Sequence, residues 1–129
     1  MFKHLLVPVD GSPLTDRAIP LSIELAQQLG AAITGFIAGA RETDALTDAH
    51  AQTVLARFEA AARAAGVVFH GYQDHRARID RAIIAAAEAR GCDMIVMVTH
   101  GRGAFGEFLF GSQTKAVLAG SKLPLLVLH

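Results

Sequence analysis

Short apolar runs alternate with longer amphipathic stretches along the whole chain. Runs of strand length occupy residues 5–9, 32–38, 67–72, 94–98 and 125–128. Apolar runs bounded by glycine, proline or aspartate are typical of strands buried in a parallel sheet, whereas apolar residues that recur every three or four positions indicate helices. The pattern therefore predicts five strands, with a helix between each strand and the next.

The helix predictions rest on caps, stops and apolar stripes. The first helix follows Ser12-Pro13, a favourable N-cap and first-turn pair, and ends at Gly30. The later helices are expected at about residues 43–65, 76–90 and 112–119. The buried stripe of the first helix is expected to consist of Leu14, Ala18, Leu21, Leu25 and Leu29.

Strict alternation of strands and helices implies βαβ units with right-handed crossovers. We expect residues 1–129 to form a single α/β domain, an open parallel sheet with helices on both faces. The first and fourth strands are the most apolar, so they should lie side by side at the centre, with the third strand at an edge. Ligands of such sheets bind beyond the carboxyl ends of the strands, where the strand order reverses. Asp10 and residues 99–103 should then share one crevice.

A glycine-rich segment follows the fourth predicted strand. Four glycines lie between positions 101 and 111, and a helical pattern begins at Ser112. Glycines allow backbone N–H groups to approach a ligand, and the first turn of a helix carries unpaired N–H groups and the positive end of the helix dipole. Strand, glycine loop and helix start together predict a phosphate site.

Two known phosphate motifs fit this segment poorly. Residues 101–106 match G-x-G-x-x-G, but a dinucleotide site also needs an acidic residue about twenty positions later. The chain has none between Ser121 and His129. Residues 106–112 match the glycine spacing of a P-loop, but Ser112 stands where that loop requires a lysine.

The segment resembles the nucleotide loop of the universal stress proteins, which reads G-x-x-G-x9-G-[S/T]. Gly101 and Gly111-Ser112 match at the right spacing, and Val98 occupies the position of the first glycine. The resemblance extends to Val-Pro-Val-Asp-Gly-Ser at residues 7–12, to residues 93–97 and to the closing residues 124–128. It covers nearly the whole chain, from Lys3 to Leu128.

The resemblance implies the strand order 3-2-1-4-5, a homodimer joined at the last strand, and binding of ATP or AMP. It implies that Asp10 lies beside the nucleotide and that Ile37 meets the adenine through its backbone. The phosphates would lie against the glycine loop. The residues implied in this loop are Val98, Thr99, His100, Gly101, Arg102, Gly103, Gly111 and Ser112.

Asp10 admits two functional interpretations and one structural one. Phosphates repel a carboxylate, so Asp10 either accepts hydrogen bonds from ribose hydroxyls or is bridged to the phosphates by Mg²⁺. As a structural residue it would begin the turn and help to cap the first helix. No metal site of protein side chains alone is expected, because His70, Asp74 and His75 fall short of a structural zinc set.

Composition narrows the class of partner. Twelve basic and twelve acidic residues give no net charge, so there is no electrostatic case for nucleic acid or an anionic membrane. The single cysteine, Cys92, allows no internal disulfide and suits a reducing compartment. With neither a secretory signal nor an apolar stretch of membrane length, the chain is expected in the cytoplasm.

The apolar composition of the last predicted strand indicates that this strand pairs with a second chain. Residues 123–128 are apolar apart from Pro124 and carry no charge that would guard an edge. An unguarded edge strand invites pairing with a second chain, most often across a two-fold axis. We therefore predict a homodimer through Leu125–Leu128.

These expectations define a nucleotide-dependent sensor or signalling dimer. Any ATP hydrolysis is expected to be slow, because the sequence supplies no lysine, arginine finger and water-positioning group of a dedicated ATPase. The alternative is a protein-interaction module of the same fold without a nucleotide.

Overall fold

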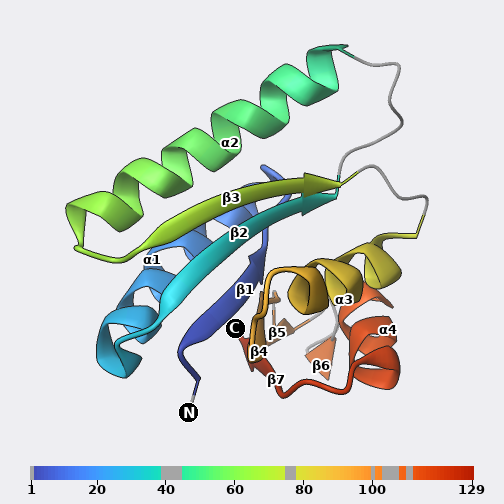
Figure 1. Ribbon diagram of the computed structural model, residues 1–129. Helices are drawn as coiled ribbons and strands as arrows, with labels where there is room; N and C mark the ends of the chain where they lie inside the picture. The colour runs from blue at the N-terminus through green and yellow to red at the C-terminus, as the bar shows by residue number, and fades with distance from the viewer. Residues whose placement is uncertain (1, 39–44, 75–77, 100, 103–107, 110–111) are drawn as a thin grey trace.

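The computed structural model describes residues 2–38, 45–74, 78–99, 101–102, 108–109 and 112–129, and of these 45–48, 101–102, 108–109 and 112–113 by their backbone alone (Figure 1). The elements in chain order are β1 (His4–Pro8), α1 (Pro13–Leu29), β2 (Ala32–Ala38), α2 (Ala45–Ala64), β3 (Phe69–Asp74), α3 (Ile79–Ala89), β4 (Met94–Val98), β5 (Gly101–Arg102), β6 (Phe108–Leu109), α4 (Ser112–Gly120) and β7 (Leu125–Leu128).

The main sheet has five parallel strands in the order β3-β2-β1-β4-β7. Since β7 is the fifth strand of this sheet, the predicted α/β class and the order 3-2-1-4-5 are confirmed. The central position of β1 and β4 and the edge position of β3 are also confirmed. The strand order reverses between β1 and β4, which places the expected ligand crevice at their carboxyl ends.

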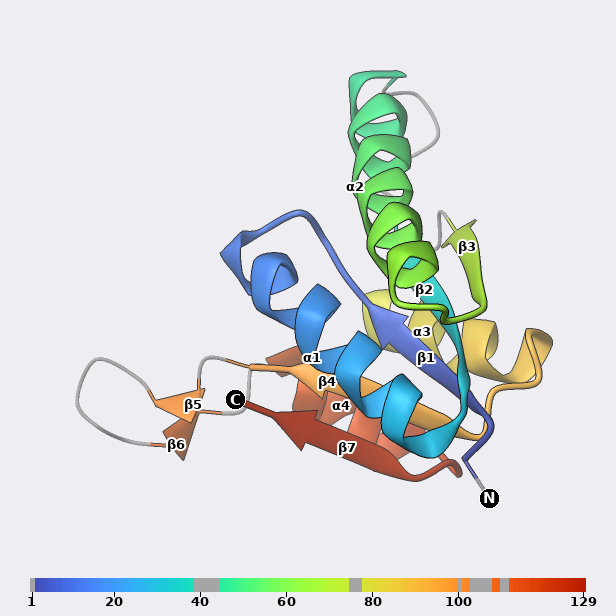
Figure 2. The same cartoon turned by 90° about the vertical axis from the view of Figure 1, so that its left-hand side faces the viewer.

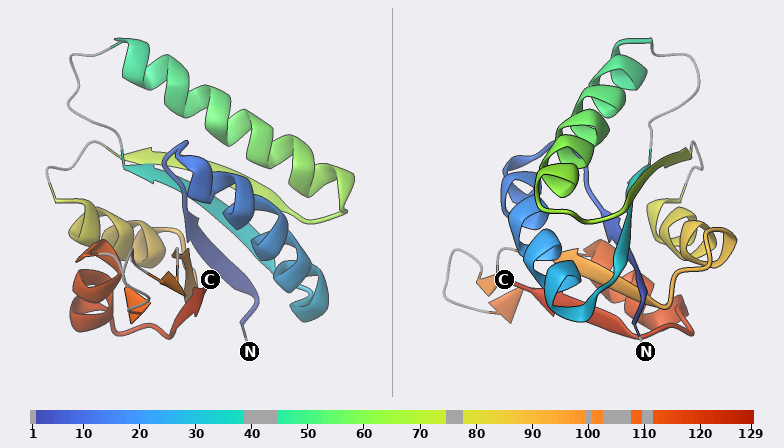
Figure 3. Two further views of the ribbon diagram at one scale, coloured as in Figure 1. Left: turned by 180° about the vertical axis from the view of Figure 1, so that it is seen from behind. Right: turned by 60° about the vertical axis from the view of Figure 1, so that its left-hand side comes forward.

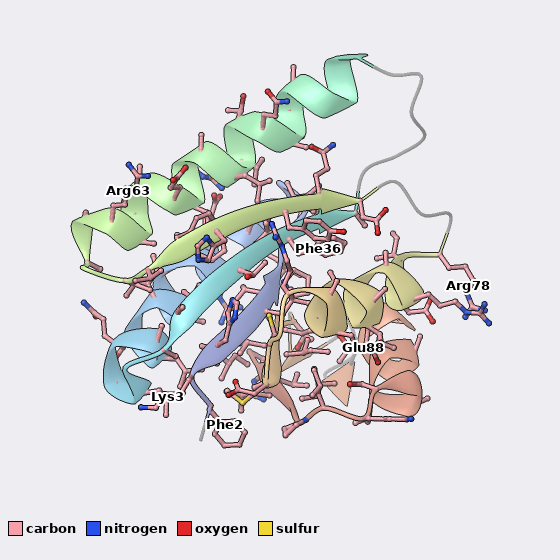
Figure 4. All side chains as sticks on the ribbon, viewed as in Figure 1. Phe2, Lys3, Phe36, Arg63, Arg78 and Glu88 are labelled. Atoms are coloured by element: carbon pink, nitrogen blue, oxygen red, sulfur yellow. The ribbon has the colours of Figure 1, made fainter. Side chains whose placement is uncertain are left out.

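Helices cover both faces of this sheet, with α1 and α2 on one side and α3 and α4 on the other (Figure 3). Alternate residues of each strand serve the two layers. Leu5 and Val7 pack on the α1 side, whereas Leu6 packs on the α3 side. Phe36, labelled in Figure 4, belongs to the α3 layer and is fully buried.

The buried face of α1 differs from the predicted leucine stripe. Ala18 is buried as expected, but the four leucines are only partly buried and flank the true contact face. This face is built from small and β-branched side chains, which let the helix approach the sheet more closely than leucines would. Its buried residues are Thr15, Ala18, Ile19, Ser22, Ile23 and Ala26.

Two boundaries also differ from prediction. β3 runs from Phe69 to Asp74, two residues later than expected at either end, and α3 begins at Ile79 rather than near Arg76. Strand and helix ends are weakly encoded by apolar pattern alone, because pairing with a neighbour decides where a strand starts. The expected start of α2 near residue 43 lies outside the described residues.

Gly35 allows two aromatic side chains to pack closely against β2. A Cβ atom at this position would lie 2.6 Å from Cζ of Phe69 and 3.1 Å from Cδ2 of Phe58. The two aromatic rings, whose centroids are 4.8 Å apart, therefore occupy the space above the glycine. This contact ties α2 and β3 to the centre of β2.

A second ladder lies within the predicted glycine loop. Gly101 pairs with Leu109 and Arg102 with Phe108, in antiparallel orientation. This pair projects away from the main sheet, beyond the carboxyl end of β4 (Figure 2). Strands of two residues carry too little pattern to be found in sequence. No described helix is long and apolar enough to cross a membrane.

A histidine lies at the opposite, amino-terminal rim of the sheet. His4 Nε2 is 2.6 Å from Thr34 Oγ1, and its ring lies 6.3 Å from that of His70. Burial lowers the pKa of His4 from its ordinary value of 6.5, the neighbouring His70 and Arg90 add to the decrease, and Asp93 opposes it. His4 is therefore held as the neutral base.

Acidification should destabilise the protein through His4. Because the folded pKa is below 6.5, the unfolded chain binds the proton more readily, so the stabilising contribution is complete above pH 6.5 and is lost as the pH falls below it. Urea unfolding of the wild type should show a lower free energy at pH 5.5 than at pH 7.5, with a smaller decrease in His4→Gln. An equal pH dependence in the two proteins would contradict this assignment.

Candidate functional site

The topology brings the predicted site residues to one rim. β1, β2 and β4 are parallel, so Asp10, the end of β2 and the end of β4 all lie at the carboxyl end of the sheet. The chain enters β7 from the opposite rim after α4, so α4 must begin at this same carboxyl rim. Helix start and carboxylate are therefore on the same side of the sheet.

The turn after β1 holds the Asp10 carboxylate through one oxygen. Oδ1 accepts the backbone N–H of Ser12 at 2.9 Å and the hydroxyl of Thr15 at 3.3 Å. The Thr15 hydroxyl oxygen in turn accepts the N–H groups of Asp10 and Gly11 at 3.2 and 2.9 Å. Within the described residues nothing donates to Oδ2, and Asp10 is exposed. Asp10 thus serves the turn with one oxygen and has the other available for a ligand.

The local electrostatics keep this carboxylate ionised. Burial tends to raise the pKa of Asp10, but hydrogen bonding from Ser12 and Thr15 outweighs it and lowers the pKa below the ordinary 3.8. The Ser12 hydroxyl contributes to this decrease in pKa. Its oxygen is nevertheless buried and outside hydrogen-bond geometry with any described residue. The turn therefore carries a full negative charge at neutral pH.

The ladder geometry of β2 determines the direction of the backbone groups at Ile37, the predicted adenine contact, and at its neighbour Ala38. Ala32 donates its N–H to β1 and Ile33 donates to the strand on the other side, so even-numbered residues of β2 face β1 and odd-numbered residues face β3. Ile37 consequently directs its backbone N–H and C=O toward β3, where it pairs with Gln73. Ala38 directs its backbone N–H and C=O toward the β1 side. It lies beyond the last hydrogen bond between these two segments, which the Val9 N–H donates to the Phe36 C=O at 2.8 Å.

Val98, the last residue of β4, lies on the other side of β1 from Ala38, the last residue of β2. Ile95 and Thr99 donate their N–H groups to β7, so the odd-numbered residues of this strand direct their backbone groups toward β7. The even-numbered Val98 therefore directs its backbone groups toward β1. Its half-buried side chain packs on the α1 side of the sheet, and its φ is negative. The side chain that replaces the family's glycine therefore points out of the plane of the sheet. Thr99 is buried beside it.

The phosphate part of the predicted site is only partly described. His100, Gly103 and Gly111 lie outside the described residues. Gly101 and Arg102 belong to β5, and Ser112 is the first residue of α4, but only their backbones are described. The phosphate contacts therefore remain predictions.

Two residues at the Asp10–Gly11 turn were missed by the sequence analysis. Thr15 could have been found, because a threonine four positions after a turn glycine is well placed to accept its N–H. His50 could not, because it approaches Gly11 from α2.

Other candidate chemistry lies outside this rim. Among the described residues, no three His, Cys, Asp or Glu side chains lie close enough together to hold a metal ion, and His75 is outside that part of the chain. Cys92 is buried, and burial raises the pKa of its thiol to about 11. A protonated, buried thiol is a poor nucleophile and metal ligand.

The fold defined by these elements is that of a doubly wound α/β protein with a polar turn at its switch point. The family model described as the universal stress protein family matches residues 1–129. A Thermus aquaticus protein named "Universal stress protein in QAH/OAS sulfhydrylase 3′region" is 33% identical over 137 residues, covering 100% of both chains. The chain therefore belongs to the universal stress protein family.

Two solved structures share the fold at lower identity. A universal stress protein in complex with cAMP is 22% identical, with a TM-score of 0.77 over 99% of this chain and 97% of the other. The universal stress protein from Archaeoglobus fulgidus in complex with dAMP is 18% identical, with a TM-score of 0.78 over 100% of both chains. Both relatives hold an adenine nucleotide.

Proposed function

We propose that this protein binds ATP or AMP at the carboxyl rim of β1 and β4 and acts as a nucleotide-dependent sensor or signalling dimer. The observation that carries the proposal is the Asp10 turn, in which one carboxylate oxygen is fixed and the other is available at the switch point of the sheet. The complexes of related proteins with cAMP and dAMP support adenine nucleotides as the ligand class.

Each part of the nucleotide has a proposed partner. Asp10 Oδ2 accepts from the ribose, and the backbone N–H and C=O of Ala38 meet the edge of the adenine in place of those of Ile37. Ile37 remains in the wall of the site as a buried core residue. The phosphates lie at Val98, Thr99, His100, Gly101, Arg102, Gly103, Gly111 and Ser112, where the first turn of α4 offers free N–H groups.

We propose that Mg²⁺ binds only together with ATP. Asp10 supplies one free carboxylate oxygen, and Mg²⁺ typically combines one or two protein carboxylates with phosphate oxygens and water. If Asp10 reaches the phosphates through the metal, affinity for ATP falls when Mg²⁺ is removed, whereas affinity for AMP does not change. If Asp10 binds the ribose directly, both affinities are independent of the metal.

The ligand class is tested by heating the purified protein and identifying the released small molecules by mass spectrometry, followed by calorimetric titration with AMP and with ATP and Mg²⁺. An adenine nucleotide in the supernatant, or saturable heat on titration, is the expected result. Absence of both would reject the proposal and favour a protein-interaction module of the same fold.

The proposed dimer uses the free edge of β7. All four residues of this strand are half-buried in the single chain, and within the described part of the chain the strand pairs on one side only, with β4. Pairing with the same strand of a second copy would satisfy this edge. We place this dimer in the cytoplasm, in keeping with a single reduced cysteine, and expect at most slow ATP hydrolysis.

A further inference from the structure

A groove of about 500 Å³ lies between α3 and α4, on the face of the sheet opposite to α1 and α2 (Figure 3). A Cβ atom on Gly120 would lie 3.0 Å from Cδ1 of Ile84, so the two helices meet at the floor of this groove. None of the residues that line it belongs to the proposed nucleotide site or to β7. Its middle is lined by small and apolar residues, namely Ile84, Ala85, Ala116, Ala119 and Gly120.

The two ends of the groove carry opposite charges. Arg81 lies near the start of α3 and Glu88 near its end, and both line the groove. They are seven positions apart (88 − 81), which places them on the same face of the helix, separated by about 10 Å. Both are exposed, and within the described part of the chain neither forms an ion pair. Each charge is therefore available to a partner.

A third charged residue at the groove is already neutralised within the chain. Arg78 and Glu88 lie toward opposite ends of α3 (Figure 4). The guanidinium of Arg78 donates to both carboxylate oxygens of Asp80, at 3.3 and 3.0 Å. The free charges that the groove presents on α3 are therefore Arg81 at one end and Glu88 at the other.

This arrangement of charges is complementary to itself. Arg81 precedes Ile84 by three residues, and Glu88 follows Ala85 by three. A second copy of α3, packed antiparallel across a two-fold axis between Ile84 and Ala85, would place each Arg81 opposite the other copy's Glu88. The antiparallel orientation also brings opposite ends of the helix dipoles together. Because the chain has no net charge, two copies do not repel each other overall.

We propose that the groove between α3 and α4 binds the same groove of a second copy of this chain, with the two α3 helices antiparallel. Complementary charges at the rim of an interface fix its register, and small residues at the centre let helices approach closely. Nine residues line the groove, whereas a stable interface takes about 20–30 residues a side, so this contact forms only at high concentration. It is independent of the pairing at β7, and where both contacts form they link dimers into larger assemblies.

The test is a charge-reversal cycle followed by sedimentation equilibrium from micromolar to millimolar concentration. The mean mass of the wild type should rise beyond its micromolar value. Arg81→Glu and Glu88→Arg each turn two attractions into two repulsions, so the dissociation constant of this contact should rise about tenfold or more. The double variant Arg81→Glu/Glu88→Arg restores opposite charges at no net change and should associate as the wild type does. An equimolar mixture of the two single variants should also associate.

Arg17→Glu is the matched control. It changes the net charge as Arg81→Glu does, but Arg17 is exposed on α1, which covers the other face of the sheet. This variant should associate as the wild type does, and circular dichroism should show that all the variants are folded. In ¹⁵N-edited NMR spectra of the wild type, amide shifts should change with concentration at Ala85, Glu88 and Ala119.

Three results would overturn the proposal. These are a mass that does not rise with concentration, single reversals that associate as the wild type does, and a double variant that fails to associate. The first of them would leave the groove to a helix of another protein. Loss of association in Arg17→Glu equal to that in Arg81→Glu would also reject it, because net charge and not the groove would then control the contact.

Discussion

Asp10→Asn is expected to raise the dissociation constant for AMP by about tenfold to a hundredfold. Asparagine retains a side-chain oxygen that can accept the N–H of Ser12, so the turn after β1 should persist. The amide, however, replaces the free anionic oxygen with a donor. Loss of a hydrogen bond to a charged group costs about 1.5–3 kcal/mol, and each 1.4 kcal/mol corresponds to about a factor of ten. Calorimetric titration with AMP measures the change.

Asp93→Asn provides the matched control. Asp93 also accepts backbone N–H groups, those of Lys3 and His4 at 2.8 and 3.1 Å, but it lies at the amino-terminal rim of the sheet. This variant should bind AMP as the wild type does, and circular dichroism should show that both variants are folded. Unchanged affinity in Asp10→Asn, or an equal loss in Asp93→Asn, would refute the assignment of Asp10 to the ligand.

Val127→Pro is expected to convert the proposed dimer to a folded monomer. Pro124 and Leu128 direct their carbonyls toward β4, so by alternation Leu125 and Val127 direct their backbone groups to the open edge. A proline at 127 therefore removes an edge donor without breaking the β4–β7 ladder. The two-fold axis doubles the loss, so the dimer dissociation constant should rise about thirtyfold or more. Sedimentation across a concentration series measures it.

Val127→Thr keeps the backbone N–H and the β-branched shape, and it should remain dimeric. The proline variant should retain its circular dichroism spectrum, which separates loss of pairing from loss of fold. A wild type that sediments as a monomer at micromolar concentration would reject the dimer. A Val127→Pro variant that stays dimeric would place the interface elsewhere.

Most of the fold could be predicted because burial leaves a direct pattern. The limits of β2, β4 and β7 agree with their apolar runs, because β2 and β4 are largely buried and the half-buried β7 consists of apolar residues alone. The edge position of β3 followed from its polar residues. The ends of α1 and α2 could also be predicted from glycines, because Gly30 and Gly66 adopt positive φ there.

The site could be predicted only where it is local in sequence. The Asp10 turn lies within six residues, 10–15, and Asp10 was found from its position after an apolar run. The directions in which Ala38 and Val98 present their backbone groups depend on the register of each strand with its neighbours, which the sequence does not reveal. His50 meets Gly11 across 39 positions (50 − 11), and no local pattern connects the two.

The central claim, that an adenine nucleotide binds at the carboxyl rim of β1 and β4, is tested most directly by ¹⁵N-edited NMR spectra recorded during titration with AMP. The account predicts that the largest amide shifts occur at Gly11, Ala38 and Thr99, with His4 and His70 unchanged. Shifts confined to the amino-terminal rim, or a spectrum that AMP does not alter, would contradict it.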